Sequence, residues 1–183
     1  MSRFWTKKIT ELDPYVPGEQ PQDKQYIKLN TNESPYSPSP KALAAMSAMV
    51  NESLRLYPDP NGMTLKSALA NQYQLDTKQV FVGNGSDEVL ALAFMGYFAG
   101  GKPLAFADIT YSFYKVYANL YDIEPQLIPL TTDFDIDPTD YQNLDVSGVV
   151  ITNPTAPTGK ALPLSDIESA LQAKPDVVVL VDE

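Results

Sequence analysis

This sequence of 183 residues contains no cysteine and no histidine. Without cysteine it offers no disulfide framework, no thiol nucleophile and no cysteine-ligated metal cluster. Without histidine it offers no Ser-His-Asp triad, no imidazole acid or base and no histidine-bound zinc. Proton transfer within this chain would therefore depend on carboxylates, lysine, tyrosine or a bound cofactor, and we expect no metal site.

Positive charge and long apolar runs are also scarce. The chain has 13 Lys and Arg residues against 23 Asp and Glu residues, and its net charge of −10 disfavours the basic surfaces that bind nucleic acid or anionic membranes. The N-terminus lacks the apolar core of a signal peptide, and the longest uncharged apolar run, residues 89–101, is too short to span a bilayer. The composition, 44 % hydrophobic, predicts a soluble cytoplasmic protein that binds neither nucleic acid nor membrane.

Residues 79–88, with the sequence QVFVGNGSDE, combine a β-branched and aromatic run, a glycine turn and the polar start of a helical pattern that continues to residue 98. This order predicts a strand, a tight turn and a helix. A helix that begins directly after a glycine turn presents unpaired N–H groups and the positive end of its dipole, which suits a phosphate. An ordinary strand-to-helix turn explains the motif alone equally well. The third glycine of a dinucleotide fingerprint and the Lys-Ser/Thr of a P-loop are both absent.

The rest of the chain alternates predicted strands with predicted helices. Strands are predicted at 26–29, 104–107, 126–130, 148–152 and 177–181, and helices over 41–54, 64–73, 111–121 and 165–173. Such alternation predicts an α/β fold with a mostly parallel sheet sandwiched by helices, and ligands at the carboxyl ends of the strands. The unbroken apolar run 177–181 is typical of a strand buried on both faces.

Prolines indicate how the chain is organised. They occur at residues 14, 17, 21, 35, 38 and 40, where they disfavour regular helix and predict an extended N-terminal arm over residues 1–40. Residues 41–183 would then form the N-terminal portion of a large domain. Because Glu183 follows a buried-type strand without a covering helix, we expect a longer polypeptide that continues beyond it.

Several short segments occur in the order and spacing of a known family. They are residues 13–18 (DPYVPG) with 28–36 (KLNTNESPY), 57–60 (YPDP), 83–88 (GNGSDE), and 110–114 (TYSFY) with 153–159 (NPTAPTG) and 181–183 (VDE). Together they resemble the fold-type I pyridoxal-phosphate-dependent transferases, and among these the aminotransferases that act on histidinol phosphate. The resemblance covers essentially the whole chain. It implies a homodimeric enzyme of histidine biosynthesis that transfers an amino group from histidinol phosphate to 2-oxoglutarate with pyridoxal 5'-phosphate as cofactor.

The resemblance also implies roles for individual residues at the cofactor. Ser86 and Asp87 would present backbone N–H groups to its phosphate, with Gly85 permitting close approach. Tyr111 would stack on the pyridine ring, although a core tyrosine is the simpler interpretation of its helical pattern. Asp182 would pair with the ring nitrogen and keep it protonated, and its simpler interpretation is a solvated carboxylate at a strand end.

Further positions follow from the same resemblance. Tyr57 would reach the cofactor phosphate of a neighbouring subunit, and Tyr15 and Asn32 would lie at the substrate. An arm that packs on the protein surface would explain Tyr15 and Asn32 equally well. The family's asparagine that hydrogen-bonds the phenolic oxygen of the cofactor is Ala156 here, so Asn153 or a water molecule substitutes for it, or the bond is absent.

The family's Schiff-base lysine and its substrate-binding arginines would lie beyond Glu183, so we assign no lysine of this chain to catalysis. The sequence leaves several alternative functions open. Within the class they are an aromatic amino-acid aminotransferase and a pyridoxal-phosphate decarboxylase with a phosphorylated substrate. A non-catalytic α/β phosphate-binding module is the alternative from another class, and a nucleotide-binding Rossmann protein is disfavoured by the missing third glycine.

Overall fold

The computed structural model of this chain describes residues 2–13 and 15–183. They form two compact units, of which the first joins residues 2–13 and Tyr15 to residues 84–183 and the second comprises residues 16–83. Pro14, one of the prolines behind the predicted arm, lies outside the described residues. The predicted arm over residues 1–40 and the domain over 41–183 follow a different division, and they stay predictions.

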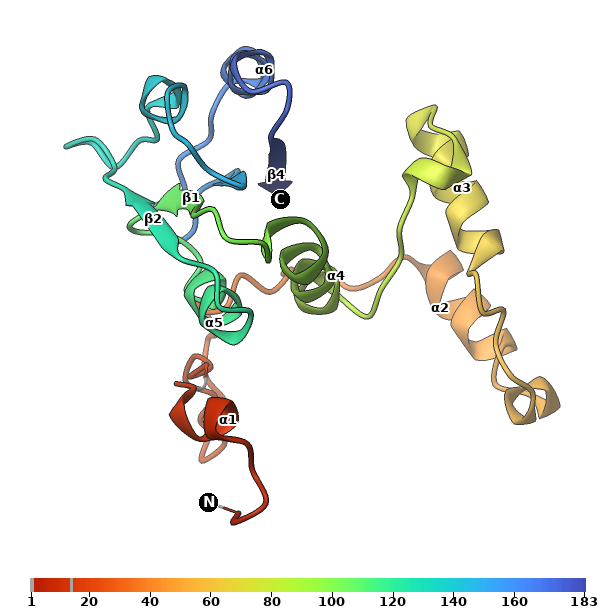
Figure 1. The fold of residues 1–183 in the computed structure, drawn as a ribbon. Helices are drawn as coiled ribbons and strands as arrows, with labels where there is room; N and C mark the ends of the chain where they lie inside the picture. The colour runs from red at the N-terminus through yellow and green to blue at the C-terminus, as the bar shows by residue number, and fades with distance from the viewer. Residues whose placement is uncertain (1, 14) are drawn as a thin grey trace. The chain divides into compact units, whose positions relative to one another are not determined.

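The first unit contains a sheet of four strands. These are β1 (Leu104–Ala107), β2 (Pro125–Ile128), β3 (Gly148–Thr152) and β4 (Val178–Asp182). They lie in the order β2-β1-β3-β4, and each neighbouring pair is parallel. Figure 1 labels β1, β2 and β4. The four strands predicted in this part of the chain and the parallel sheet are therefore confirmed, with small differences at the strand ends.

The helices of the first unit follow the predicted order, except that α1 lies in the segment predicted to be extended. They are α1 (Lys7–Glu11), α4 (Ser86–Ala93) with a π-helical continuation over Phe94–Phe98, α5 (Phe113–Leu120) and α6 (Leu164–Ala173), and a 3₁₀ turn occupies Pro138–Tyr141. Buried side chains recur three and four residues apart on α5, at Tyr114, Tyr117 and Ala118, so one side of this helix faces the core. None of the described helices is long and apolar enough to cross a membrane.

Each face of the sheet has its own core, because side chains alternate along a strand. Phe106 of β1 belongs to one buried cluster with Phe98 and with Tyr114 of α5. Ala105, the residue before it, belongs to a second cluster with Ala170 of α6. Helices thus cover both faces of the sheet, which confirms the predicted sandwich.

The second unit is built from short helices. They are α2 (Pro40–Ala48), a 3₁₀ turn over Glu52–Arg55, α3 (Met63–Tyr73) and a 3₁₀ turn over Thr77–Gln79. The side chain of Ser39 caps α2 by accepting the N–H of Ala42 at 3.2 Å. Among the described residues in these helices, Ala70 alone is buried, so the unit exposes many apolar side chains.

Two predicted strands are wrong. Residues 26–29 and 80–82 pair with no strand of the described chain. Just before the second segment, Asp76 and Gln79 form a capping box that winds residues 77–79 into a 3₁₀ turn. Residues 80–82 are left without a strand neighbour to receive their backbone hydrogen bonds, so their apolar side chains do not by themselves make a strand.

The helix predicted over 41–54 is too long. The side chain of Asn51 donates to the carbonyl of Ala48 and accepts the N–H of Ser53, both at 2.8 Å. These bonds satisfy the end of α2 and begin the 3₁₀ turn that follows, because short polar side chains offer the backbone an alternative to helix.

The prediction that residues 177–181 are buried on both faces is also wrong for this sheet. β4 pairs with β3 alone and is therefore an edge strand. Val178 is 39 % exposed, and the rest of β4 is half-buried. An edge strand lacks a neighbour on one side, so its side chains receive less cover than those of a central strand.

Gly148, at the start of β3, generates a prediction about stability. A Cβ at this position would overlap Phe98, lying 2.5 Å from its Cδ1, and would be 3.1 Å from the backbone oxygen of Val178. Since Phe98 is completely buried, it has no free space to enter. We expect Gly148→Ala to lower the free energy of unfolding by about 1–3 kcal/mol, measured by urea denaturation of the product of the complete gene.

Gly96→Ala is the matched control, because a Cβ at Gly96 would meet nothing within 4 Å. Gly96 lies in the π-helical continuation of α4, where alanine is more favourable than glycine. The control should therefore retain full stability. An equal loss in the two variants, or no loss in Gly148→Ala, contradicts the packing described.

Candidate functional site

The carboxyl ends of β1 and β3 lie side by side because these strands are parallel neighbours. From β1 the chain continues to β2 on one side of the sheet, whereas from β3 it continues to β4 on the other. Open α/β sheets bind their ligands in the crevice beside such a reversal. Tyr111 follows β1, Asn153 follows β3 and Asp182 ends β4, so three of the predicted site residues meet at this edge.

The N-terminus of α4 carries the predicted phosphate cradle. Gly85 is its N-cap, with φ of 82°, and a Cβ added there would meet nothing within 4 Å. Among the described residues, no side chain caps the first N–H groups of the helix, and Ser86 and Asp87 are exposed. The first N–H groups and the positive end of the helix dipole are therefore available to an anion. The three residues predicted for the phosphate fit such a group.

The side chain of Asp87 binds two tyrosines rather than its own helix. Tyr111 donates its hydroxyl to Oδ1 of Asp87 at 3.1 Å, and the Tyr117 hydroxyl lies 3.3 Å from the same Oδ1 and 2.9 Å from the backbone carbonyl oxygen of Asp87. These bonds hold the start of α4 against α5. Burial, followed by the charge of Asp87 and its hydrogen bond, raises the pKa of Tyr111 to about 12, and the same causes raise the pKa of Tyr117.

The ring of Tyr111 is half-buried among other aromatic side chains. Its centroid lies 5.6 Å from that of Tyr114, 5.9 Å from Phe113 and 6.5 Å from Tyr15. These neighbours fix the orientation of the Tyr111 ring while part of it stays accessible. Tyr15 also packs on Phe113 at 4.6 Å, so the structure brings this predicted substrate residue next to the predicted ring-stacking residue.

Asp182 is held through both its backbone and its side chain. Its backbone pairs with Thr152 of β3, and its carbonyl accepts the N–H of Asn153 at 2.8 Å. Its carboxylate oxygen Oδ2 accepts the hydroxyl of Tyr114, which is completely buried. Thr152 shares hydrogen bonds of 2.9 Å with Tyr114 and with Thr110. Asp182 is therefore anchored at the strand end and is not a freely solvated carboxylate.

The sequence reasoning missed Thr110, Thr152 and Tyr114. Two signals in the sequence point toward them. Thr152 is a polar residue at the end of the apolar run of β3, and Tyr114 lies about one helical turn after Tyr111. Neither signal indicates Asp182 as the common partner.

The side chain of Asn153 is engaged within its own loop. Its Oδ1 accepts the N–H of Leu162 at 2.8 Å, and its Nδ2 donates to the Leu162 carbonyl at 3.4 Å. The loop between them contains cis peptide bonds before Pro154 and Pro157. The amide of Asn153 thus fastens this loop, and its predicted contact with a cofactor stays a prediction.

The two remaining predicted residues, Tyr57 and Asn32, belong to the second unit. Tyr57 is fully exposed, and Asn32 has the left-handed backbone conformation, with φ of 53°. The loop after Tyr57 is ordered by Asp59, whose carboxylate accepts the N–H groups of Asn61 at 3.0 Å and Met63 at 2.6 Å. These bonds lower the pKa of Asp59. The proposed roles of Tyr57 and Asn32 stay predictions.

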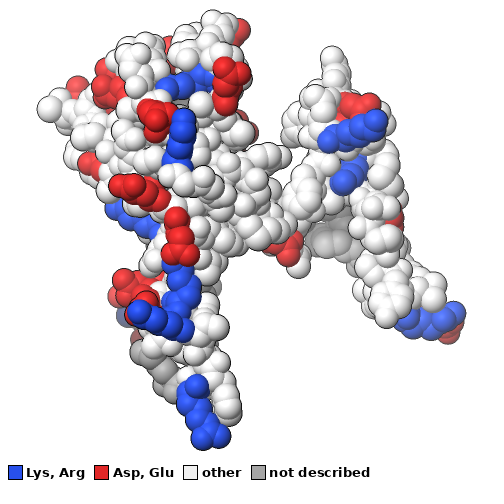
Figure 2. All heavy atoms as spheres, viewed as in Figure 1, with Lys and Arg blue, Asp and Glu red and all other residues white. Residues whose placement is uncertain are grey.

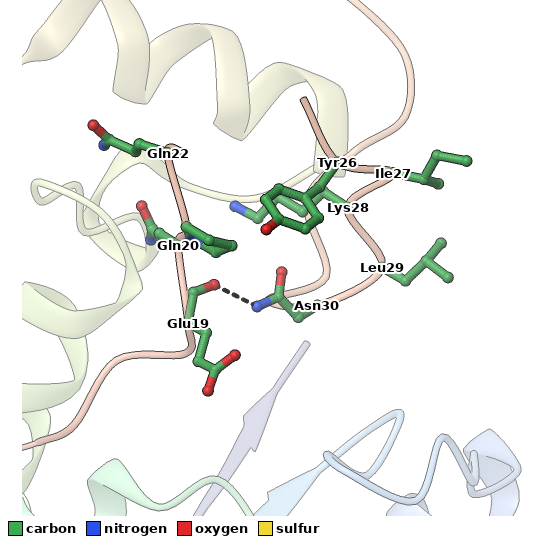
Figure 3. Close-up of a pocket in the computed structure, with 9 residues that line it drawn as sticks. Glu19, Gln20, Gln22, Tyr26, Ile27, Lys28, Leu29 and Asn30 are labelled. Carbon is green, nitrogen blue, oxygen red and sulfur yellow. Dashed lines mark hydrogen bonds between the residues drawn. The ribbon is translucent and has the colours of Figure 1, made fainter. Parts of the chain in front are cut away.

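A hollow of ≈ 620 Å³ lies within the second unit, between residues 19–22 and 26–30 (Figure 3). The side chain of Asn30 joins its two sides by donating to the carbonyl of Glu19 at 2.8 Å. Its lining residues are all exposed, and it includes none of the predicted site residues. We therefore regard the carboxyl edge of the sheet, where Tyr111, Asn153 and Asp182 lie, as the candidate site.

Acidic and basic side chains are interspersed on the face shown in Figure 2. Ion pairs within the first unit include Lys102 with Asp145 at 2.6 Å and Lys160 with Asp135 at 3.2 Å. This face therefore does not present the uniform positive field that attracts nucleic acid.

Comparison with known proteins assigns this chain to a family. Residues 24–183 match the family described as aminotransferase class I and II, and the chain belongs to that family. It is 82 % identical over all 183 residues to histidinol-phosphate aminotransferase of Marinomonas sp. (strain MWYL1) and covers 52 % of that protein. It is 55 % identical over its whole length to histidinol-phosphate aminotransferase 1 of Hydrogenovibrio crunogenus (strain DSM 25203 / XCL-2), covering 51 % of it.

The chain therefore spans about half the length of the curated relatives it matches. Among solved structures it resembles histidinol-phosphate aminotransferase from Sinorhizobium meliloti, determined in complex with pyridoxal-5'-phosphate. The TM-score is 0.76 at 23 % identity, and the match covers 84 % of this chain and 42 % of that one. This likeness confirms the predicted fold-type I transferase architecture.

The raised pKa of Tyr111 leads to a prediction about pH. Its pKa moves from the ordinary 10.0 to about 12 in the folded chain, so the folded state binds this proton more tightly than the unfolded state does. Its contribution to stability is complete below pH 10 and is lost as the pH rises toward 12. Subtracting the phenolate absorbance titration of Tyr111→Phe from that of the wild type should give a step near pH 12.

Asp87→Asn provides the control for this titration. It removes the charge next to Tyr111 and leaves the burial of the ring unchanged, so the Tyr111 step should move to lower pH. A wild-type step at the pH of ordinary tyrosine, or a step that Asp87→Asn leaves in place, contradicts the contact with Asp87.

Proposed function

We propose that the complete protein is a pyridoxal-phosphate-dependent aminotransferase that transfers the amino group of histidinol phosphate to 2-oxoglutarate in histidine biosynthesis. One observation carries this proposal: an anchored carboxylate, Asp182, shares the carboxyl edge of the sheet with the uncapped, accessible start of α4 at Gly85. Family membership and the high identity to two histidinol-phosphate aminotransferases support the choice of reaction. We also propose that the protein acts in the cytoplasm.

The residues at this edge suit the proposed cofactor. When bound, pyridoxal phosphate supplies a ring that withdraws the electron pair left behind as the amino donor loses a proton. The N–H groups of Ser86 and Asp87 would bind its phosphate, and Gly85 leaves room for close approach. Asp182 would keep a proton on the ring nitrogen, because a neighbouring carboxylate favours the cationic form. Tyr111 would lie against the flat face of the ring.

The proposed contacts around the ring and substrate have unequal support. Tyr15 packs beside Tyr111, which supports a place for it at the substrate, whereas Asn32 is proposed from the resemblance alone. A direct bond from Asn153 to the phenolic oxygen would require its amide to release Leu162. Since Ala156 has no polar side chain, a water molecule is the better candidate for that bond.

This function predicts that the product of the complete gene takes up pyridoxal phosphate with a visible absorption band that borohydride removes. It should then form glutamate from histidinol phosphate and 2-oxoglutarate. In Asp182→Asn the fold should persist while kcat falls on the order of 100-fold, because an amide does not hold the ring nitrogen protonated. Visible spectra and a glutamate assay measure both effects.

Asp176→Asn makes the same chemical change at an exposed position shortly before β4 and should leave turnover unchanged. Wild-type protein without the absorption band would refute the proposed cofactor. Turnover in Asp182→Asn equal to that of Asp176→Asn would refute the role of Asp182, and faster turnover of aromatic amino acids than of histidinol phosphate would refute the proposed substrate.

We further propose a two-fold homodimer in which Tyr57 of each chain reaches the cofactor phosphate of the other. Tyr57 is 102 % exposed, as suits a side chain that serves another subunit. The second unit also exposes large apolar side chains, including Leu43, Met46, Leu54, Leu56 and Leu65. Exposed apolar surface of this kind is typical of an interface, and an isologous interface would make the two Tyr57 contacts equivalent.

Mixing two inactive variants, Tyr57→Ala and Asp182→Asn, tests this arrangement. Under subunit exchange, a heterodimer would contain one site with both residues intact. Activity should rise to about a quarter of the wild-type value per subunit, because half of randomly formed dimers are heterodimers and each has one good site of two. A mixture no more active than its parents would mean that each chain supplies its own Tyr57.

A further inference from the structure

Three hydroxyl groups form a line that ends at the carboxylate of Asp182. Thr110, after β1, shares a 2.9 Å hydrogen bond with Thr152 at the end of β3. Thr152 shares a second bond of 2.9 Å with Tyr114 of α5, and Tyr114 donates to Oδ2 of Asp182. The proposed function described so far gives these three hydroxyls no role.

The number of available hydrogens sets the direction of this line. An ionised carboxylate only accepts, so the single hydroxyl hydrogen of Tyr114 is directed at Asp182. The Tyr114 oxygen must then accept from Thr152, whose oxygen in turn accepts from Thr110. All three groups therefore donate toward Asp182, and hydrogen bonds aligned in this way polarise and strengthen one another.

Burial preserves this arrangement. Tyr114 is 0 % and Thr152 is 7 % exposed, so water has little access to their hydroxyls. Burial and the hydrogen bond to Asp182 also raise the pKa of Tyr114 above that of ordinary tyrosine. The Tyr114 hydroxyl consequently stays protonated and remains a donor over the working pH range of a protein.

We infer that Tyr114 is a positioning residue for Asp182, supported by Thr152 and Thr110, and this inference rests on the proposed function. Tyr114 engages Oδ2, whereas Oδ1 has no hydrogen-bond partner among the described residues. Because β3 already fixes the backbone of Asp182, the bond from Tyr114 orients the carboxylate. It leaves Oδ1 free for the ring nitrogen of the cofactor.

Two variants interrupt the line of hydroxyls at different places. Tyr114→Phe removes the last hydroxyl but keeps a ring to pack on Phe94 and Phe106. Thr152→Val removes the middle hydroxyl and leaves Tyr114 able to donate. Tyr141→Phe is the matched control, because the Tyr141 hydroxyl is also buried, has no hydrogen-bond partner in the described part of the chain and lies in the other core cluster.

The first measurement is the affinity of the cofactor-free product of the complete gene for pyridoxal phosphate, by fluorescence titration. Tyr114→Phe should bind about tenfold more weakly, the effect of losing one hydrogen bond to a charged group. Thr152→Val should lose less, and Tyr141→Phe should match the wild type. In an Asp182→Asn background, Tyr114→Phe should change the affinity by less than about twofold, because its effect acts through Asp182.

The second measurement is the pH dependence of the visible spectrum of the bound cofactor. The colour of the bound cofactor changes when a group attached to its ring loses a proton. A positive charge on the ring nitrogen lowers the pKa of that group. In Tyr114→Phe, Asp182 should hold the positive charge on the ring nitrogen less firmly. The pKa of the group attached to the ring should then rise, so the colour change should move to higher pH. A merely structural role for Tyr114 does not move this transition.

The possible outcomes separate the inference from the function on which it rests. Wild-type protein that binds no pyridoxal phosphate rejects the proposed function and, with it, the inference. If the wild type binds and Tyr114→Phe behaves like Tyr141→Phe, the inference alone is wrong. It is also wrong if Tyr114→Phe loses as much affinity in the Asp182→Asn background as in the wild type.

Discussion

The parallel pairing of β1 with β3 is the constraint on which the candidate site depends. Its register sets Leu104 beside Gly148 and Phe106 beside Val150, so the segments that follow both strands emerge at one edge of the sheet. The pairing of β3 with β4 then places Thr152 beside Asp182. Because backbone hydrogen bonds make these placements, the short side chains of Thr110 and Thr152 reach one another, and Tyr114 reaches both Thr152 and Asp182. No long, flexible side chain, which would cost conformational entropy to order, is needed.

Helix α5 connects the two ends of this site. Tyr111, which precedes the helix, and Tyr117 bind Asp87 at the start of α4, whereas Tyr114 binds Asp182. A single rigid segment therefore fixes the distance between the exposed N–H groups of α4 and the carboxylate at the end of β4. A ligand with a phosphate at one end and a basic ring nitrogen at the other has two anchors of fixed separation. Positioning both before binding reduces the entropy lost when the ligand binds.

The elements predicted correctly have local signals, and so do the candidate site residues that the structure brings together. Apolar runs in the sequence indicate β1 and β3, and a glycine turn indicates the start of α4. Asp182 comes at the end of the apolar run of β4, in one of the segments that occur in the order of the family. The role of Tyr114 had no such signal, because it depends on how α5 packs on β3 and β4. The same is true of Gly148, whose lack of a side chain matters only because Phe98 lies against it. Contacts between residues far apart in the chain arise from the fold and leave no spacing to detect.

The two wrong strand predictions and the wrong burial prediction for β4 share one physical cause. Residues 26–29, residues 80–82 and the run of β4 were all judged from apolar side chains, and in the structure Leu29 is 92 %, Phe81 is 61 % and Val178 is 39 % exposed. An apolar pattern indicates that burying these side chains is favourable, but it does not indicate which other surface they pack against. The second unit carries the same property on α2 and α3, where apolar side chains such as Leu43 and Leu65 are exposed. Burying such side chains against another chain is favourable by roughly 25 cal/mol per Å² of apolar area, and this is the physical reason to expect that the second unit takes part in assembly.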